Sequence, residues 1–204
     1  MQLIGMLDSP YVRRVAISFR LLGIPFEHHP LSVFSTFKEF RRINPVVKAP
    51  TLVCDDGEVL MDSNLILDYG EALAGSGRSL VPADLPERRR ALRLTGLALA
   101  ACEKTVQIIY ERNLRPPEKQ HQPWVDRVLG QLAAAYSELE RGLGGRLPTV
   151  ASGSVDQAGI SAAVAWRFTR MTLPDMARAS DYPSLGAFSE RAERIPAFTD
   201  FPPD

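Results

Sequence analysis

The chain has 204 residues, 45% of them hydrophobic and 24% charged, a composition ordinary for a globular protein of one large or two small domains. Its 24 basic residues balance 24 acidic ones, which argues against nucleic-acid binding. No stretch approaches the roughly 18 consecutive apolar residues of a membrane span. We expect no signal peptide. The two cysteines, Cys54 and Cys102, are far apart in the sequence and form no C-x-x-C pair, which fits a protein of the reduced cytoplasm.

The first 75 residues alternate between strand-like and helix-like patterns. Apolar residues recur at helical spacing after Ser9 and Pro10, and Asp56-Gly57 is a favoured hairpin turn between two strand-like runs. The pattern predicts a small α/β domain with a mixed sheet in the order βαβαββα. In chain order we expect a strand at 2–6, a helix from about 10 to 22, a strand at 25–31, a short helix at 35–42, strands at 52–54 and 59–61, and a helix ending near 73.

The rest of the chain is predicted to be helical. Residues 76–86 are rich in Gly, Ser and Pro and indicate a linker, and residues 87–204 carry no convincing strand pattern. Apolar residues at helical spacing predict three long helices and some shorter ones in this all-α domain. The expected ranges are 86–114, 123–143, a helix from about 156 with Ile160, Ala163, Val164, Phe168 and Met171 on one face, and short helices within 174–195.

Three short motifs connect this organisation to a known family. They are "SPYVRRV" at 9–15, "NPVVKAPTL" at 44–52 and "MDSNLILDY" at 61–69. In their order and spacing, and with the α/β half followed by a helical half, the chain resembles the cytosolic glutathione transferases. The first motif is similar to that of serine-type members such as the tau class. The resemblance implies a thioredoxin-like N-terminal domain, glutathione as co-substrate, a homodimer and a cytoplasmic role in detoxification.

Ser9 is the catalytic candidate that this resemblance suggests. A free thiol has a pKa of about 8.5, so glutathione is mostly unreactive at neutral pH unless its thiolate is stabilised. A hydroxyl at a helix N-terminus can supply a hydrogen bond to the sulfur, and the helix dipole helps. Ser9 can equally be an ordinary helix cap. We expect these two roles to compete in part, since a hydroxyl has one proton.

Two further stretches are candidates for binding the rest of glutathione. The resemblance implies a cis bond before Pro50, with the backbone of Ala49 pairing with the cysteinyl unit and Lys48 meeting the glycyl carboxylate. It also implies that Ser63, at the start of a helix, binds the γ-glutamyl carboxylate while Asp62 binds the amine. The alternatives are a trans proline, a solvated lysine and a simple N-terminal cap.

The electrophile pocket is assigned by topology alone. The resemblance places the helical domain along this pocket and suggests lining residues at Leu7, Tyr11, Phe34 and Tyr110. Three scattered histidines without paired ligand spacing predict no metal site. The family's capping box departs here, because Gly159 stands three residues after Asp156, where an Asp is usual.

The sequence therefore predicts a glutathione transferase that conjugates the thiolate to small hydrophobic electrophiles. A glutathione-dependent isomerase or dehalogenase would use the same thiolate with a different pocket. A non-catalytic binding protein of the same fold is the third possibility.

Overall fold

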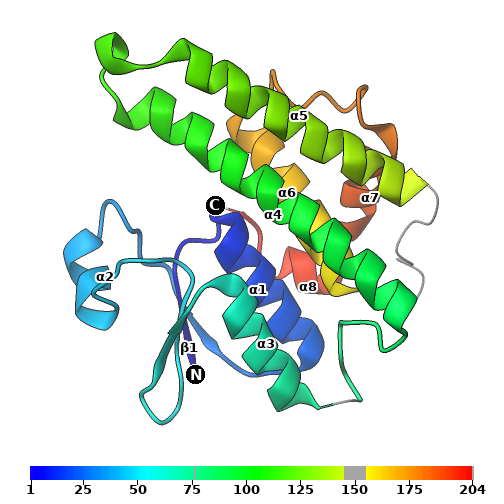
Figure 1. Cartoon of the computed structure of the whole chain (residues 1–204). Helices are drawn as coiled ribbons and strands as arrows, with labels where there is room; N and C mark the ends of the chain where they lie inside the picture. The colour runs from blue at the N-terminus through cyan, green and yellow to red at the C-terminus, as the bar shows by residue number, and fades with distance from the viewer. Residues whose placement is uncertain (76, 145–154, 204) are drawn as a thin grey trace. The chain divides into compact units, whose positions relative to one another are not determined.

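The computed structural model describes residues 1–75, 77–144 and 155–203 in two compact units (Figure 1). The first unit comprises Met1–Val81 with Arg194–Asp204, and the second comprises Pro82–Glu193. Residues 194–203, which the sequence assigned to the helical domain, thus belong to the α/β unit. Ser76 of the predicted linker lies outside the described residues. Within the described ranges no helix has the length and apolarity needed to cross a bilayer.

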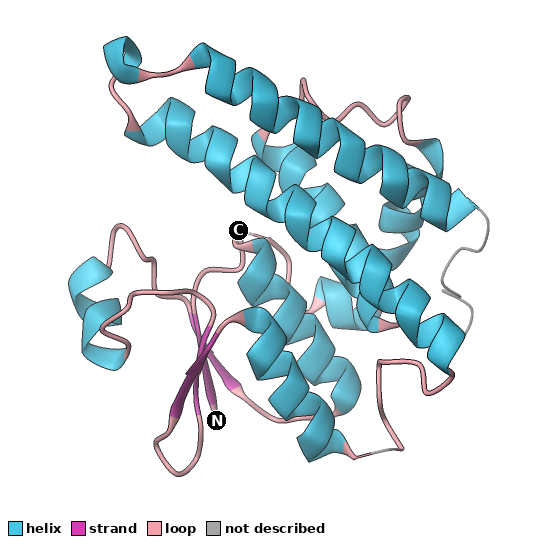
Figure 2. Cartoon of the chain, viewed as in Figure 1, coloured by secondary structure: helices cyan, strands magenta, loops and turns pink. Residues whose placement is uncertain are grey.

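The first unit has the predicted element order around a four-stranded mixed sheet (Figure 2). The strands follow one another across the sheet as β2-β1-β3-β4, with β1 parallel to β2 and antiparallel to β3. A parallel neighbour needs a crossover, and the first helix supplies it. The elements are β1 (Gln2–Ile4), α1 (Pro10–Leu22), β2 (Glu27–His29), α2 (Phe37–Ile43), β3 (Thr51–Val53), β4 (Val59–Met61), α3 (Ser63–Ala74) and, from the chain's end, α8 (Pro196–Thr199).

Helices α1 and α3 pack against each other in this unit (Figure 1). Their facing side chains join those of β1 and β3 in one apolar core that includes Leu3, Phe19, Leu52 and Ile66. The apolar spacing of α1 places Arg13 and Arg14 off the apolar stripe, yet both side chains are buried. Each guanidinium is held by groups from distant parts of the sequence, which the helical pattern alone does not reveal.

In the second unit the described residues form helices and no strand (Figure 2). Helix α4 packs against both α5 and α6, and α7 packs against α5 and α6. A buried hydrogen bond of 2.7 Å joins the hydroxyls of Thr105 on α4 and Thr169 on α6. The elements are α4 (Leu85–Leu114), the 3-10 helix η1 (Pro117–Lys119), α5 (Gln122–Gly144), α6 (Gln157–Thr172) and α7 (Pro183–Ala192).

Helix α6 differs from the one-faced helix that the sequence predicts. Every residue from Gln157 to Trp166 is buried, while Met171, expected on the apolar face, is 42% exposed. Asp156 caps the helix by accepting a 2.7 Å hydrogen bond from the Gly159 N–H. A Cβ at position 159 would lie 2.5 Å from Val155 Cγ2 and 3.0 Å from Phe188 Cζ. Close packing therefore explains why a glycine, and not the Asp expected from the resemblance, stands at position 159.

The Gly159→Ala variant is expected to lower the free energy of unfolding by about 1–3 kcal/mol, the usual effect of overpacking. This loss should exceed the gain of about 1 kcal/mol that alanine has over glycine in a helix. Gly130→Ala is the matched control, because Gly130 lies within α5 and its Cβ would meet nothing within 4 Å. Urea denaturation should show the control equal to or more stable than the parent protein. Equal stabilities for both variants would contradict the packing explanation.

Candidate functional site

Ser9 is the N-cap of α1, and its hydroxyl oxygen accepts a long 3.5 Å hydrogen bond from the Val12 N–H. Pro10 occupies the first helical position, where a missing N–H costs nothing. A hydroxyl carries one donor and two acceptor lone pairs. The cap uses a lone pair, and no described residue accepts the hydroxyl proton. The cap observed here leaves the proton of the hydroxyl unused, so it does not by itself exclude thiolate binding, which stays a prediction.

The loop before β3 is pinned by buried side chains. The Asn44 amide donates to Thr51 Oγ1 at 2.8 Å, and Thr51 Oγ1 donates to the Lys48 carbonyl at 2.7 Å. The Ala49–Pro50 peptide bond is cis, as predicted. No backbone hydrogen bond from the described residues reaches the N–H or C=O of Ala49. Both groups thus remain available to a peptide-like ligand.

Gly5, at the end of β1, lets this loop approach the start of α1. Its φ of 139° lies in a region that favours glycine, and a Cβ there would lie 2.6 Å from Val12 Cγ2 and 3.2 Å from Ala49 Cβ. Any side chain at this position would push the helix and the loop apart. The absence of a side chain therefore helps to bring the first turn of α1 beside Ala49.

The start of α3 carries the other two predicted residues. Asp62 is the N-cap, with an unusual φ of 75°, and its carboxylate accepts a 2.9 Å hydrogen bond from the Asn64 N–H. Strained backbone of this kind is stable only where surrounding contacts enforce it, as at ligand-binding sites. Ser63 is buried, and its hydroxyl accepts a 3.0 Å hydrogen bond from Nη1 of Arg14.

Lys48 and Asp62 contact each other directly, with Nζ 3.2 Å from Oδ2. The resemblance predicts that these side chains bind opposite ends of glutathione. In the free protein the Lys48 ammonium forms an ion pair with the Asp62 carboxylate, the group that is expected to bind the amine of glutathione. Each group keeps spare hydrogen-bonding capacity for a ligand, because an ammonium has three donors and a carboxylate about four lone pairs.

The charge of Asp62 is favoured by its surroundings. Burial alone would raise the pKa of this carboxyl group, but the Asn64 N–H and the positive charges of Lys48 and Arg14 outweigh it and lower the pKa below the ordinary 3.8. A carboxylate at this point can bind an ammonium group at neutral pH. The neighbouring Ser63, at the positive end of the helix, suits a carboxylate.

The Asp62→Asn variant is expected to lose stability at neutral pH, by less than about 1 kcal/mol because the ion pair is exposed. Asn retains the cap. Since the folded pKa of Asp62 lies below its unfolded value, the contribution is complete above about pH 4 and disappears as the pH falls through the folded value. The difference in unfolding free energy between parent and variant should therefore shrink between pH 7 and pH 3.

Asp156→Asn is the control for this pH dependence. Burial raises the pKa of Asp156, so acidification should stabilise the parent protein relative to this variant, the opposite sign. If the difference in unfolding free energy between the parent protein and Asp62→Asn does not change with pH, the lowered pKa of Asp62 is contradicted.

The remaining predicted residues differ in exposure and belong to both units. Leu7 is buried in the core of the first unit, Tyr11 is half-buried on α1, and Phe34 is 57% exposed. Tyr110 belongs to α4 in the second unit and is 43% exposed. Their assignment to an electrophile pocket stays a prediction. Among the described residues no group of three or more His, Cys, Asp or Glu side chains is placed to hold a metal ion.

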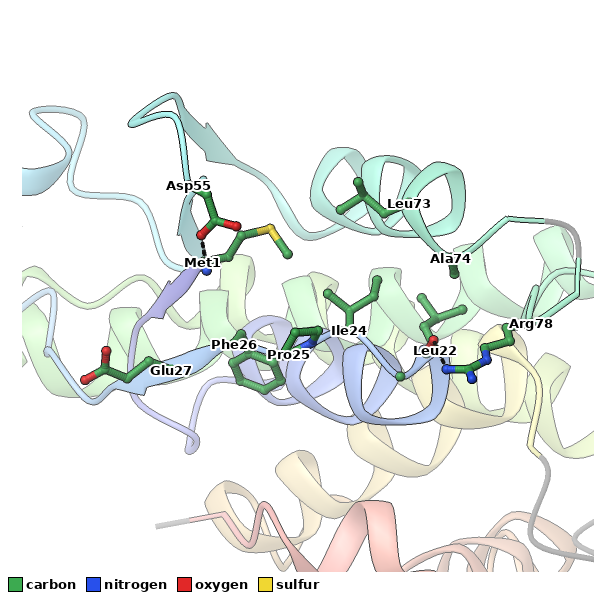
Figure 3. Close-up of a pocket in the computed structure, with 11 residues that line it drawn as sticks. Met1, Leu22, Ile24, Pro25, Phe26, Glu27, Asp55, Leu73, Ala74 and Arg78 are labelled. Carbon is green, nitrogen blue, oxygen red and sulfur yellow. Dashed lines mark hydrogen bonds and ion pairs between the residues drawn. The ribbon is translucent and has the colours of Figure 1, made fainter.

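A cavity of about 690 Å³ in the first unit contains none of the predicted site residues (Figure 3). It lies at the other end of α1 from Ser9, beside Leu22 and the last turn of α3. The Met1 ammonium contacts Asp55 at 2.6 Å at its rim, and Arg78 donates to the Leu22 carbonyl, which ends α1. These polar groups are used within the fold, so we do not connect the cavity with glutathione.

Two residues that were not predicted as site residues, Asn44 and Arg14, hold the site together. Arg14 lies in the motif "SPYVRRV" and Asn44 in the motif "NPVVKAPTL", and these positions are the sequence signal for their roles. Asn44 ties the loop to β3, and Arg14 ties α1 to the start of α3. Their roles depend on partners that only the folded chain brings near.

Comparison with known proteins now adds to this geometry. The family model for the glutathione S-transferase N-terminal domain matches residues 3–78. A solved glutathione transferase family member from Pseudomonas fluorescens, with bound S-(propanoic acid)-glutathione, is 30% identical, and the match covers all of both chains with a TM-score of 0.83. The chain belongs to the glutathione transferase superfamily. The thioredoxin-like N-terminal domain and helical C-terminal region predicted from the sequence are thereby confirmed.

Two further members of the superfamily are similar to this chain. A glutathione S-transferase from Methylobacterium radiotolerans, solved with glutathione sulfonate, is 28% identical over 99% of this chain and 94% of its own, with a TM-score of 0.90. Glutathione S-transferase U4 of Arabidopsis thaliana is 31% identical over 45% of this chain. The chain spans 40% of that relative, and about half or less of the length of the curated relatives it matches.

Proposed function

We propose that this protein is a glutathione transferase that binds glutathione on its first unit and conjugates the thiolate to small hydrophobic electrophiles. The observation that carries the proposal is the convergence of three elements: the start of α1 with Ser9, the loop with Ala49 and Pro50, and the start of α3 with Asp62 and Ser63. The contacts through Gly5 and the Lys48–Asp62 ion pair link them. Glutathione derivatives bound in two similar structures support the choice of ligand.

The charges of the first unit match the ends of the tripeptide. Asp62 is suited to the γ-glutamyl ammonium, Ser63 to the adjacent carboxylate and Lys48 to the glycyl carboxylate. The free backbone groups of Ala49 are suited to the cysteinyl unit, in the manner of an added strand. The Ser9 hydroxyl then donates its unused proton to the sulfur and stabilises the thiolate.

A thiol-exchange activity has less support than conjugation. Cys54 and Cys102 are both buried. Burial, reinforced by the carboxylate of Asp56, raises the pKa of the Cys54 thiol above its ordinary value, which disfavours the reactive thiolate. Position 9 holds a serine, which cannot form a mixed disulfide with glutathione. Neither cysteine is in a disulfide bond, which also supports the proposed cytoplasmic location.

A homodimer is part of the same proposal. Leu65, Tyr69 and Leu73 recur every fourth residue on α3 and are 65%, 36% and 49% exposed, so one face of this helix is apolar and open. A second copy of the chain would remove these side chains from water. Light scattering of the purified protein, alone and with Leu65→Glu, tests this assembly through the measured mass.

Calorimetric titration with reduced glutathione tests the proposed function. We expect binding at or below millimolar ligand, and glutathione-dependent consumption of a chromogenic aryl halide. No binding at millimolar glutathione would favour a non-catalytic protein of the same fold. Binding without conjugation, but with turnover of an isomerisation or dehalogenation substrate, would move the proposal to those reactions.

A further inference from the structure

Arg14 is a buried guanidinium on α1 that reaches the first turn of α3. Its Nη1 donates to Ser63 Oγ at 3.0 Å and to Asn64 Oδ1 at 2.8 Å. The Arg14 and Ser63 side chains are each only 3% exposed. We propose that Arg14 is the positioning residue for the γ-glutamyl carboxylate, because it forces the Ser63 hydroxyl to donate its proton to the ligand. This inference rests on the proposed function.

The direction of the hydrogen bond follows from the chemistry of the two groups. A guanidinium has donors and no acceptor, so Ser63 Oγ can only accept from Arg14. Nη1 carries two N–H bonds, and the second donates to Asn64 Oδ1. No described residue accepts this proton. A buried donor without an acceptor is costly, and a bound carboxylate would relieve that cost.

The charge of Arg14 acts in the same direction. It adds a full positive charge, weakly screened because it is buried, to the partial charge at the start of α3. The nearby carboxylate of Asp62 faces the exposed Lys48 and the Asn64 N–H. The adjacent residues Asp62 and Ser63 thus offer a carboxylate acceptor and a hydroxyl donor, and the positive charge of Arg14 lies beside that donor. The γ-glutamyl group carries an ammonium and a carboxylate on one carbon, and this pair of charges matches it.

A ligand lacking that carboxylate separates a positioning role from a structural one. The probe is 4-aminobutyryl-cysteinyl-glycine, which keeps the amine, the thiol and the glycyl carboxylate of glutathione. Calorimetry should show that the parent protein binds it about 10- to 100-fold more weakly than glutathione, the value of one charge-assisted hydrogen bond. In Arg14→Met the ratio of the dissociation constant of this probe to that of glutathione should fall to within about threefold of unity. The KM for glutathione should rise by a larger factor than kcat changes.

Two variants complete the test. Arg13→Met removes the adjacent buried guanidinium, which contacts the carbonyls of Phe198 and Phe201, and should leave the ratio at the parent value. Arg14→Gln replaces Arg14→Met if that variant does not fold. The glutamine amide offers an oxygen to which Ser63 can donate its proton, so the ratio of the two dissociation constants should fall in this variant as well.

A parent-like ratio in the folded Arg14 variants, with both tripeptides weakened equally, would overturn the inference and leave the proposed function intact. Failure of the parent protein to bind glutathione would instead overturn both.

Discussion

Ser9→Ala is expected to lower kcat/KM for glutathione with a chromogenic aryl halide by about 10- to 100-fold. The variant loses the hydrogen bond to the thiolate, worth about 1.5–3 kcal/mol, and each 1.4 kcal/mol or so is a factor of ten. The start of α1 still favours an anion, so some activity should remain. The pH profile of kcat at saturating glutathione should shift to higher pH, because it reports the bound thiol and the pKa of that thiol moves toward its ordinary value of about 8.5.

Ser9→Gly separates catalysis from capping. Glycine at an N-cap costs only a few tenths of a kcal/mol, whereas alanine costs about 1 kcal/mol. Both variants lack the hydroxyl, so both should lose the same activity, while only Ser9→Ala should lose appreciable stability on urea denaturation. Unchanged kcat/KM in both variants would show that Ser9 is a cap and that another group activates the thiol.

Arg13→Met is expected to lower the free energy of unfolding by about 2–4 kcal/mol. Arg13 Nε donates to the Phe201 carbonyl at 2.8 Å, and Nη2 donates to the Phe198 carbonyl at 3.4 Å. The guanidinium also lies 5.7 Å from the centre of the Phe198 ring. The variant leaves two carbonyls without their charged donor, and hydrogen bonds to charged groups are worth about 1.5–3 kcal/mol each.

Arg20→Met is the control for this prediction. Arg20 also lies on α1 and contacts the same C-terminal segment, through a 2.9 Å ion pair with Asp200, but both side chains are largely exposed. An exposed pair of this kind contributes about 0–1 kcal/mol. Urea denaturation should therefore distinguish the two variants, and limited proteolysis should release residues 194–204 faster in Arg13→Met. Equally small losses would mean that Arg13 does not hold this segment.

The sequence by itself determined the elements of the first unit. Glycine is favoured in the hairpin because the φ of Gly57 is 90°, and the Ser9 and Asp62 caps bond to N–H groups three and two residues away. Such features depend on local geometry, which short patterns encode directly. The three motifs likewise pointed to the superfamily before any contact was known.

Only the tertiary structure decided what the polar side chains contact. Helical spacing placed Arg13 and Arg14 off the apolar stripe of α1, yet their partners come from residues 198–201 and 63–64. The Lys48–Asp62 ion pair joins a loop to a helix start. A periodic pattern reports which face of a helix is apolar, but not which donor or acceptor from a distant segment lies opposite a polar side chain. That depends on how the packed elements meet, which only the folded chain determines.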